Sequence, residues 1–280
     1  MNKAWIILSF GSLIAFVLVE ARILSPMVPL TLFRSGKFSG ANLLTLFLYA
    51  AIGIFFFLLP LNLIQVQGYS PTAAGIAILP FIVLMFLLSR WAGGLVARYG
   101  ARGPLILGPL IAAMGFALFA VPSVGDSYWR SFLPALVILG LGMTVTVAPL
   151  TTVVMNSVTE GRVGTASGIN NAVARVAGVL AIAVLGIVMV EAFSFRLDRS
   201  LSGLSLPSHV RQELQANEIK LAGLPLPAGL GPAANAVIKE SVKGAFVFGF
   251  RIIMLICAGL SLSSAAVAWR MIPKENDRRV

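Results

Sequence analysis

The stretch LLTLFLYAAIGIFFFLLPLNLI, at residues 43–64, decides the fold class. It contains no charged side chain. A helix needs about 20 consecutive apolar residues to cross the hydrocarbon core of a bilayer. The stretch therefore predicts a membrane-spanning helix.

The composition of the whole chain agrees with a membrane protein. Of its 280 residues, 58% are hydrophobic and 11% are charged, which lies outside the usual range of soluble domains. The net charge is +11, but the basic residues are spread over short loops and the tail, as topology signals are. A single cysteine, Cys257, cannot build a disulfide framework, a zinc ribbon or a c-type haem site. We predict an all-α polytopic membrane protein with no cofactor, no metal and no nucleic-acid partner.

Seven apolar runs are long enough to be spans. They lie at residues 4–19, 43–64, 74–96, 105–121, 132–154, 173–193 and 245–269. We interpret the first run as a span rather than a secretory signal, because no small-x-small cleavage site follows it and six more runs do. The prediction is one transmembrane helix with its loop in 1–41, a six-helix bundle in 42–272 and a tail in 273–280.

The basic residues of the short loops predict an N-terminus outside and a cytoplasmic C-terminus. In that topology the inner side holds Arg22, Arg34, Lys37, Arg98, Arg102, Arg162, Arg270, Lys274, Arg278 and Arg279. The long segment 195–244 would then be an extracytoplasmic loop. Its six basic residues are discounted, because long loops cross a membrane largely regardless of charge. Its His209, the only histidine, is interpreted as a solvated surface residue.

Ionisable residues inside spans are costly, so each one is a candidate site. Glu20, Arg90 and Arg175 fall near predicted inner ends, where snorkelling explains them. Glu191 and Arg251 both fall near the outer side, on the sixth and seventh spans. We predict a structural ion pair between them.

Hydrogen-bonding side chains collect in PLTTVVMNSVTEGRVGTASGINNAVARVAG, at residues 149–178. They predict either the lining of a water-filled path or hydrogen bonds that join helices. Asn170 and Asn171 are the candidates for the path in this stretch. No Ser-His-Asp, paired-carboxylate or metal-ligand group occurs along the chain, so we predict that it is not an enzyme.

Three stretches carry a family resemblance: residues 25–80 from SPMVPL to AILP, GGLVARYGARGP at 93–104, and residues 148–178 from APLTTV to RVAG. They resemble the C-terminal half of a major facilitator superfamily transporter, in the fourteen-span drug:proton antiporter (EmrB/QacA-type) branch. The resemblance implies two six-helix bundles around a central path, with two extra helices linking them. The first span here would be the second linker helix, and the other six the C-terminal bundle.

The resemblance also implies which helices line the path. In such a bundle the first and fourth helices face the cavity, and the third and sixth face lipid, which favours a structural role for Arg251. The candidates for substrate contact on the first and fourth helices are Thr45, Tyr49, Asn62, Gln65, Met143, Thr144 and Thr146.

GGLVARYGARGP is interpreted as a cytosolic turn. Its glycine spacing matches neither nucleotide-binding fingerprint, and no strand precedes it, so a phosphate cradle is excluded. The family turn reads G-x-x-x-D-R-x-G-R-x, and the residues on or beside its positions are Gly93, Ala97, Arg98, Gly100 and Arg102. Ala97 stands at the aspartate position, which predicts a weakened inner gate.

The resemblance covers only one bundle. The prediction is therefore half of an efflux-type, proton-coupled secondary transporter for small, drug-like molecules, working by alternating access and inactive alone. Its expected partners are the lipid bilayer, a small-molecule substrate, and an N-terminal bundle or a second half-chain. Met1 falls at the start of the linker helix, which favours a truncated chain.

Two alternatives are kept. A non-transporting membrane scaffold or assembly partner is the stronger one. A seven-helix receptor or light-driven pump fits the helix count, but a retinal protein needs a buried lysine in the last span, and Lys243 lies only at its edge.

Overall fold

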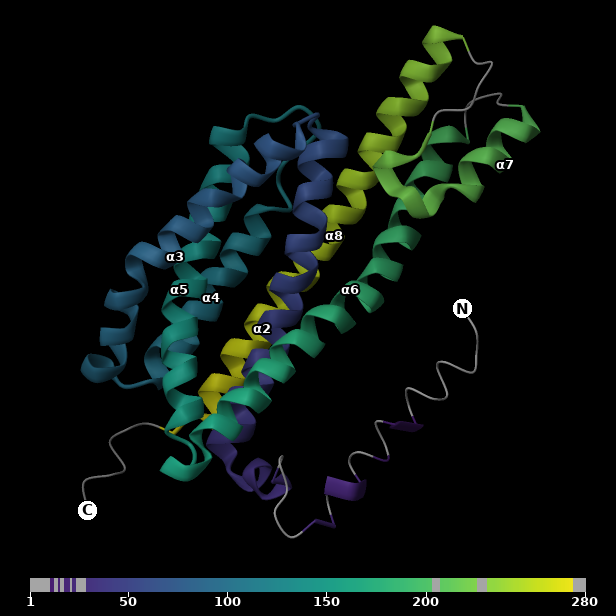
Figure 1. Ribbon diagram of the computed structural model, residues 1–280. Helices are drawn as coiled ribbons and strands as arrows, with labels where there is room; N and C mark the ends of the chain where they lie inside the picture. Colours follow the sequence, from purple (N-terminus) through teal and green to yellow (C-terminus); the bar gives the residue numbers. More distant parts are fainter. Residues whose placement is uncertain are drawn as a thin grey trace.

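The computed structural model describes residues 29–202, 207–225 and 231–273, with isolated positions between 11 and 23. The predicted first span at 4–19 lies mostly outside the described residues, as does the tail beyond 273. Within the described part the chain is helical and contains no strand (Figure 1). The predicted all-α class is confirmed.

The six bundle helices follow the predicted order. The elements are η1 (Leu30–Arg34), α2 (Gly36–Leu61) with the π-helical turn η2 (Asn62–Val66), α3 (Pro71–Tyr99), α4 (Arg102–Leu118), η3 (Tyr128–Phe132) with α5 (Leu133–Met155), η4 (Glu160–Arg162) with α6 (Val163–Leu201), α7 (Ser208–Ala216), η5 (Glu218–Gly223) and α8 (Pro232–Met271). Five of the helical stretches are long and apolar enough to cross a membrane, and α4 is a shorter apolar helix.

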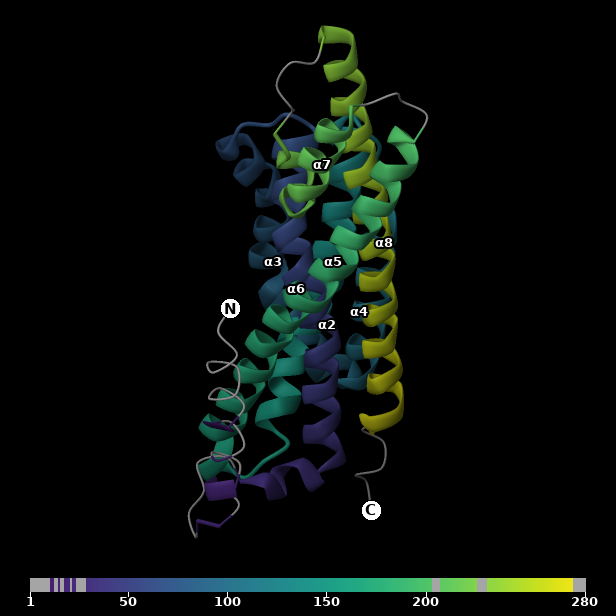
Figure 2. The same ribbon diagram turned by 90° about the vertical axis from the view of Figure 1, so that its right-hand side faces the viewer.

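The bundle has a central group of helices and two flanks. Helix α8 packs against α2, α4 and α6, while α5 packs against α3 and α4 (Figures 1 and 2). Helices α3 and α6 are the flanks, because only 17% of their most apolar windows is buried, against 56% for α8. In its second half, α8 exposes the large apolar side chains of Leu255, Leu262 and Trp269, at heptad spacing.

Local sequence signals set the helix ends. The Ser35 and Ser70 side chains cap α2 and α3 by accepting hydrogen bonds from the backbone N–H groups of Phe38 and Ala73. Helix α3 ends at Gly100, whose φ of 71° suits a residue without a Cβ. Only Gly100 and Ala101 separate α3 from α4.

Glycines allow two helix pairs to approach closely. A Cβ at Gly142 of α5 would lie 2.4 Å from the backbone nitrogen of Ala112 in α4. A Cβ at Gly53 of α2 would lie 2.6 Å from the Cα of Gly178 in α6. These glycines therefore allow the two helix pairs to pack closely. Gly164 and Gly168 of α6 differ, because a Cβ there would meet nothing within 4 Å.

The segment 195–244, predicted as a loop, is largely helical in its described residues. Helix α6 continues to Leu201 and α8 begins at Pro232, so both helices extend past their predicted apolar limits. Between them lie α7 and η5, at one end of the bundle (Figure 1). The sequence after Phe193 contains no glycine or proline until Gly203, so nothing in it stops α6 where its apolar run ends.

Candidate translocation path

A polar cluster joins α2 to α6. The Asn170 side-chain amide donates to Thr45 Oγ1 at 2.7 Å and to Asn42 Oδ1 at 3.2 Å. Asn42 and Thr45 are buried and donate in turn to the Phe38 and Ala41 carbonyls of their own helix. The structure thus brings two predicted path residues together, as hydrogen-bonded neighbours.

Asn42 was not among the path residues predicted from the sequence. Its signal was its position three residues before Thr45, because residues at i and i+3 lie on one face of a helix. Asn171, in contrast, is exposed and donates only to the Ser167 carbonyl of its own helix, at 3.0 Å. Neighbouring helical residues point about 100° apart, so only one of the two asparagines can reach α2.

The three candidates on α5 are buried inside the bundle. Met143 and Thr144 are 3% exposed and Thr146 is fully buried. The two hydroxyls donate to the carbonyls of Gly140 and Gly142, four residues earlier in the same helix. In this conformation these side chains pack between helices and do not line an open cavity.

The remaining candidates are Tyr49 near the middle of α2 and Asn62 and Gln65 in η2. Tyr49 is half-buried, and Asn62 is 2% exposed at the start of η2. Gln65 Oε1 is buried and accepts no hydrogen bond from any described residue.

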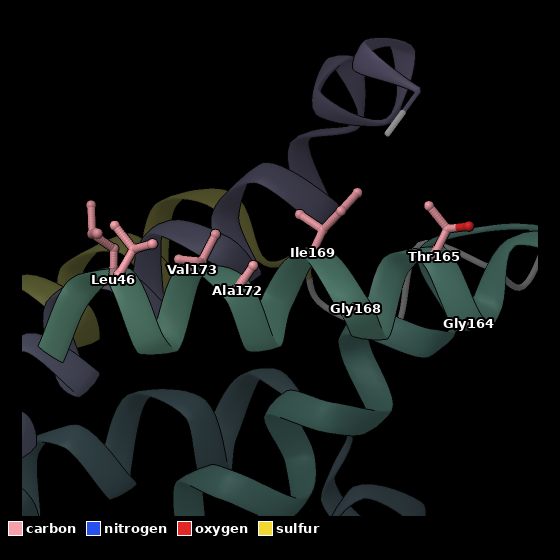
Figure 3. Close-up of a pocket in the computed structure, with 8 residues that line it drawn as sticks. Leu46, Gly164, Thr165, Gly168, Ile169, Ala172 and Val173 are labelled. Carbon is pink, nitrogen blue, oxygen red and sulfur yellow. The ribbon is translucent and has the colours of Figure 1, made fainter. Parts of the chain in front are cut away.

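Helices α2 and α6 cross where Gly53 meets Gly178. Two grooves lie between these helices, one on each side of the crossing. The groove beside the start of α6, which follows η4, is called the η4 groove. It has a volume of about 620 Å³ and is lined by Leu46, Gly164, Thr165, Gly168, Ile169, Ala172, Val173 and Val176. Its α6 side chains project from the same side of the helix (Figure 3). The η5 groove has a volume of about 560 Å³ and is lined by residues of α2, η2, α6 and η5, including Gln65 and Glu191.

The predicted gate turn connects α3 to α4 and contacts α8. The Arg102 guanidinium donates to the Trp269 carbonyl, near the end of α8. Arg98 lies over the Tyr99 ring, 5.4 Å from its centroid. Gly93 and Ala97 are exposed, and a Cβ at Gly93 would meet nothing within 4 Å. Both positions therefore lie on an exposed face of α3.

The predicted ion pair between Glu191 and Arg251 is wrong for the described residues. The Arg251 guanidinium donates to the carbonyls of Val121 and Pro122 and, at 2.8 Å, to Ser123 Oγ. These acceptors lie between α4 and η3, three to five residues beyond Leu118, the last residue of α4. Glu191 lies instead in the η5 groove.

Comparison with known proteins identifies the family. Residues 4–182, more than half of the chain, match the Major Facilitator Superfamily. The chain belongs to this superfamily. It is therefore a multi-pass membrane protein from a family of transporters.

Several relatives are similar to most of this chain. The Tetracenomycin C resistance and export protein of Streptomyces glaucescens is 30% identical over 273 residues, covering 94% of this chain and 49% of that protein. The multidrug resistance protein Stp of Mycobacterium tuberculosis (strain ATCC 25618 / H37Rv) is 30% identical over 273 residues, covering 93% and 49%. The Lincomycin resistance protein of Streptomyces lincolnensis is 34% identical over 184 residues, covering 63% and 38%. The chain spans about half the length of the first two relatives.

Proposed function

We propose that this chain is the C-terminal half of an efflux-type secondary transporter of the fourteen-span drug:proton antiporter (EmrB/QacA-type) branch. It works by alternating access and exports small, drug-like molecules. The observation that carries the proposal is the match of one six-helix bundle to about half the length of proteins named for export and drug resistance. The chain alone is inactive, and its N-terminus lies outside and its C-terminus in the cytoplasm.

The exposure of the two flanking helices supports the proposal of an N-terminal partner bundle. Helices α3 and α6 are the least buried long helices, and both expose glycines, at Gly93, Gly94, Gly164 and Gly168. Small residues on an exposed helix face allow another helix to approach closely in a membrane. An N-terminal bundle docked on these flanks would enclose the path between the two halves.

The described path residues suggest where proton coupling resides. Thr45, Asn170 and Gln65 do not exchange protons near neutral pH. Coupling in the assembled transporter is therefore assigned to the partner bundle. Ala97 replaces the aspartate of the family turn, so this half contributes a weaker gate.

The test is transport by the chain with and without a partner. We expect a tagged chain, purified from its native membrane in mild detergent, to bring with it a second membrane chain of six to eight spans. Reconstituted alone in proteoliposomes, it should not export tetracenomycin C, whereas the two chains together should export a compound named for a relative. Export by the lone chain would overturn the half-transporter proposal.

A non-transporting scaffold is the second proposal. The observation in its favour is the burial of Met143, Thr144 and Thr146, so that none of these three predicted path residues faces an open cavity. A scaffold would co-purify with a partner but would leave export unchanged when it is deleted.

A further inference from the structure

Basic side chains gather where α8 ends. A Cβ at Gly40 of α2 would lie 2.7 Å from the Met271 Cβ, and the Arg102 guanidinium of α4 donates to the Trp269 carbonyl. The starts of α2 and α4 therefore meet the end of α8, at the end of the bundle away from α7 (Figures 1 and 2). These three helix ends and the end of α3 carry four cations, which we call the basic cluster: Lys37, Arg98, Arg102 and Arg270.

No carboxylate on the same helices balances the basic cluster. Helices α2, α3 and α4 contain no acidic residue, and the only one in α8, Glu240, precedes Arg270 by about 45 Å of helix. Glu160 belongs to η4 at the start of α6, and Glu20 is buried with a contact of its own. None of the four cations forms an ion pair with a described carboxylate. Their counterion must therefore come from outside these helices.

Two exposed aromatic side chains indicate the depth of the cluster in the membrane. Tyr99 is 63% exposed and follows Arg98 in the sequence, and Trp269 is 60% exposed and precedes Arg270. Tyrosine and tryptophan favour the boundary between hydrocarbon and water, where the headgroups lie. The cations beside them therefore lie at the depth of the phospholipid phosphates.

Apolar stripes lead from the cluster toward the middle of the membrane. In the second half of α8, exposed residues at spacings of four and three form a stripe that ends beside Arg270: Leu255, Gly259, Leu262, Ala266 and Trp269. The stripe is about 21 Å long, more than half of a hydrocarbon core of roughly 30 Å. Helix α4, which packs against α8, exposes a second stripe beyond Arg102, at Leu107, Leu110 and Met114. The exposed surface thus offers apolar contacts to acyl chains below a headgroup at the cluster.

We propose that the basic cluster binds the headgroup of an anionic phospholipid, whose acyl chains lie along α4 and α8. Basic residues between transmembrane helices attract anionic headgroups, and guanidinium groups donate strong hydrogen bonds to phosphate. Arg270 is exposed and free to donate, and Arg102 has further N–H groups besides the one bound to the Trp269 carbonyl. The lipid thereby ties the starts of α2 and α4 to the end of α8. Only its assignment to the cytoplasmic leaflet rests on the proposed topology.

The experiment measures lipid enrichment beside Trp269, with Trp129 as the internal control. Trp129 is 74% exposed in η3, which follows the end of α4, whereas Arg102 begins α4. Two chains each keep one of these tryptophans and carry phenylalanine in place of the other three. Each chain is placed in phosphatidylcholine nanodiscs with a minor fraction of phosphatidylglycerol, and bromine on the acyl chains of one lipid or the other quenches the fluorescence of a nearby tryptophan. Both leaflets contain both lipids, so the result does not depend on the topology or on transport.

Phosphatidylglycerol should be preferred over phosphatidylcholine by at least about tenfold beside Trp269, and not beside Trp129. Each basic residue at a membrane surface contributes about fivefold, so Arg270→Gln should lower the preference by about that factor. Arg270→Lys keeps the charge and should retain most of the preference. Arg199→Gln, at an exposed position near the end of α6, is the matched control and should change nothing. Unchanged quenching by brominated phosphatidylcholine confirms that each variant is inserted.

Equal quenching of Trp269 by the two brominated lipids would overturn the site, as would the same preference at Trp129. Equal losses in Arg270→Gln and Arg199→Gln would also overturn it, because the attraction would then belong to the whole charged surface. Glycerol 1-phosphate, added in solution, separates a bound lipid from a free anion. If it abolishes the preference at Trp269, the occupant is a soluble phosphate and the lipid proposal is wrong; if the preference survives, the lipid is retained.

Discussion

At the scale of single residues, Asn170 shows how a polar side chain in an apolar helix is used. Its amide bridges Asn42 and Thr45 on α2, whereas the adjacent Asn171 bonds only within α6. We expect Asn170→Leu to lower the free energy of unfolding by about 1 kcal/mol, the typical size of an interhelical hydrogen bond in a membrane protein.

The matched control is Asn171→Leu, which removes the same group from an exposed position. It should change the free energy of unfolding by less than about 0.5 kcal/mol. Unfolding in mixed micelles with rising denaturing detergent measures both variants. Equal destabilisation by the two would mean that the bridge to α2 contributes nothing beyond the local helix.

Arg251 illustrates the limit of pairing charges by sequence. Glu191 lies on α6, the apolar span that precedes the span of Arg251 in the sequence. This order suggested the ion pair. Packing instead turns Arg251 toward the segment between α4 and η3, where the carbonyls of Val121 and Pro122 and the Ser123 hydroxyl supply three acceptors. All three acceptors bind Nη2, and Nε is buried without a hydrogen-bond partner among the described residues. Opposite charge alone therefore does not select the partner of this guanidinium.

At the scale of helices, the crossing of α2 and α6 depends on one glycine more than on the other. A Cβ at Gly53 would lie 2.6 Å from the Gly178 Cα, but a Cβ at Gly178 would lie 3.8 Å from the Gly53 Cα, an ordinary contact. Gly53→Ala should therefore push the helices apart and lower the free energy of unfolding by about 1–3 kcal/mol. Gly178→Ala should be neutral or slightly stabilising, because alanine favours helix.

The same unfolding assay in mixed micelles distinguishes the two variants. The separation of the helices can be followed as well, by the distance between spin labels at Leu46 and Ile169 on the two walls of the η4 groove. A larger effect of Gly178→Ala than of Gly53→Ala would contradict the geometry of the crossing.

The helices themselves were predictable because a span is encoded in a long local run of apolar residues. The run at 43–64 became α2 with its π-helical turn, and the run at 132–154 became α5. Helix ends were less predictable, since α6 passes its apolar limit at Phe193 and continues to Leu201. No local stop signal marks the true end, and the packing of α7 and η5 on α6 is a long-range feature.

The candidate path was predicted only in part, for a related reason. Helix α5 is apolar on every side, so no periodicity tells whether Thr144 and Thr146 face a cavity or a neighbouring helix. The meeting of Thr45 with Asn170 depends on the crossing angle of α2 and α6, which no local pattern contains. The unused acceptor of Gln65 likewise appears only once η5 folds over it.

At the scale of the whole molecule, the bundle has two flanks, α3 and α6, that its own helices leave open. Gly168 of α6 lines the η4 groove, and a Cβ there would meet nothing within 4 Å. Gly168→Leu should therefore leave the stability of the lone chain unchanged within about 0.5 kcal/mol. It should instead reduce association with the proposed N-terminal bundle, because a bulky side chain keeps another helix away from this face.

The control for this prediction is Gly259→Leu, at an exposed position of α8 where a Cβ also meets nothing within 4 Å. Helix α8 is not a flank, so its variant should retain the partner during affinity purification in mild detergent, whereas Gly168→Leu should lose most of it. Equal retention by both variants would place the partner elsewhere on the bundle. Equal loss would mean that added bulk anywhere on the lipid-exposed surface disturbs assembly, and the open flank of α6 would then have no special role.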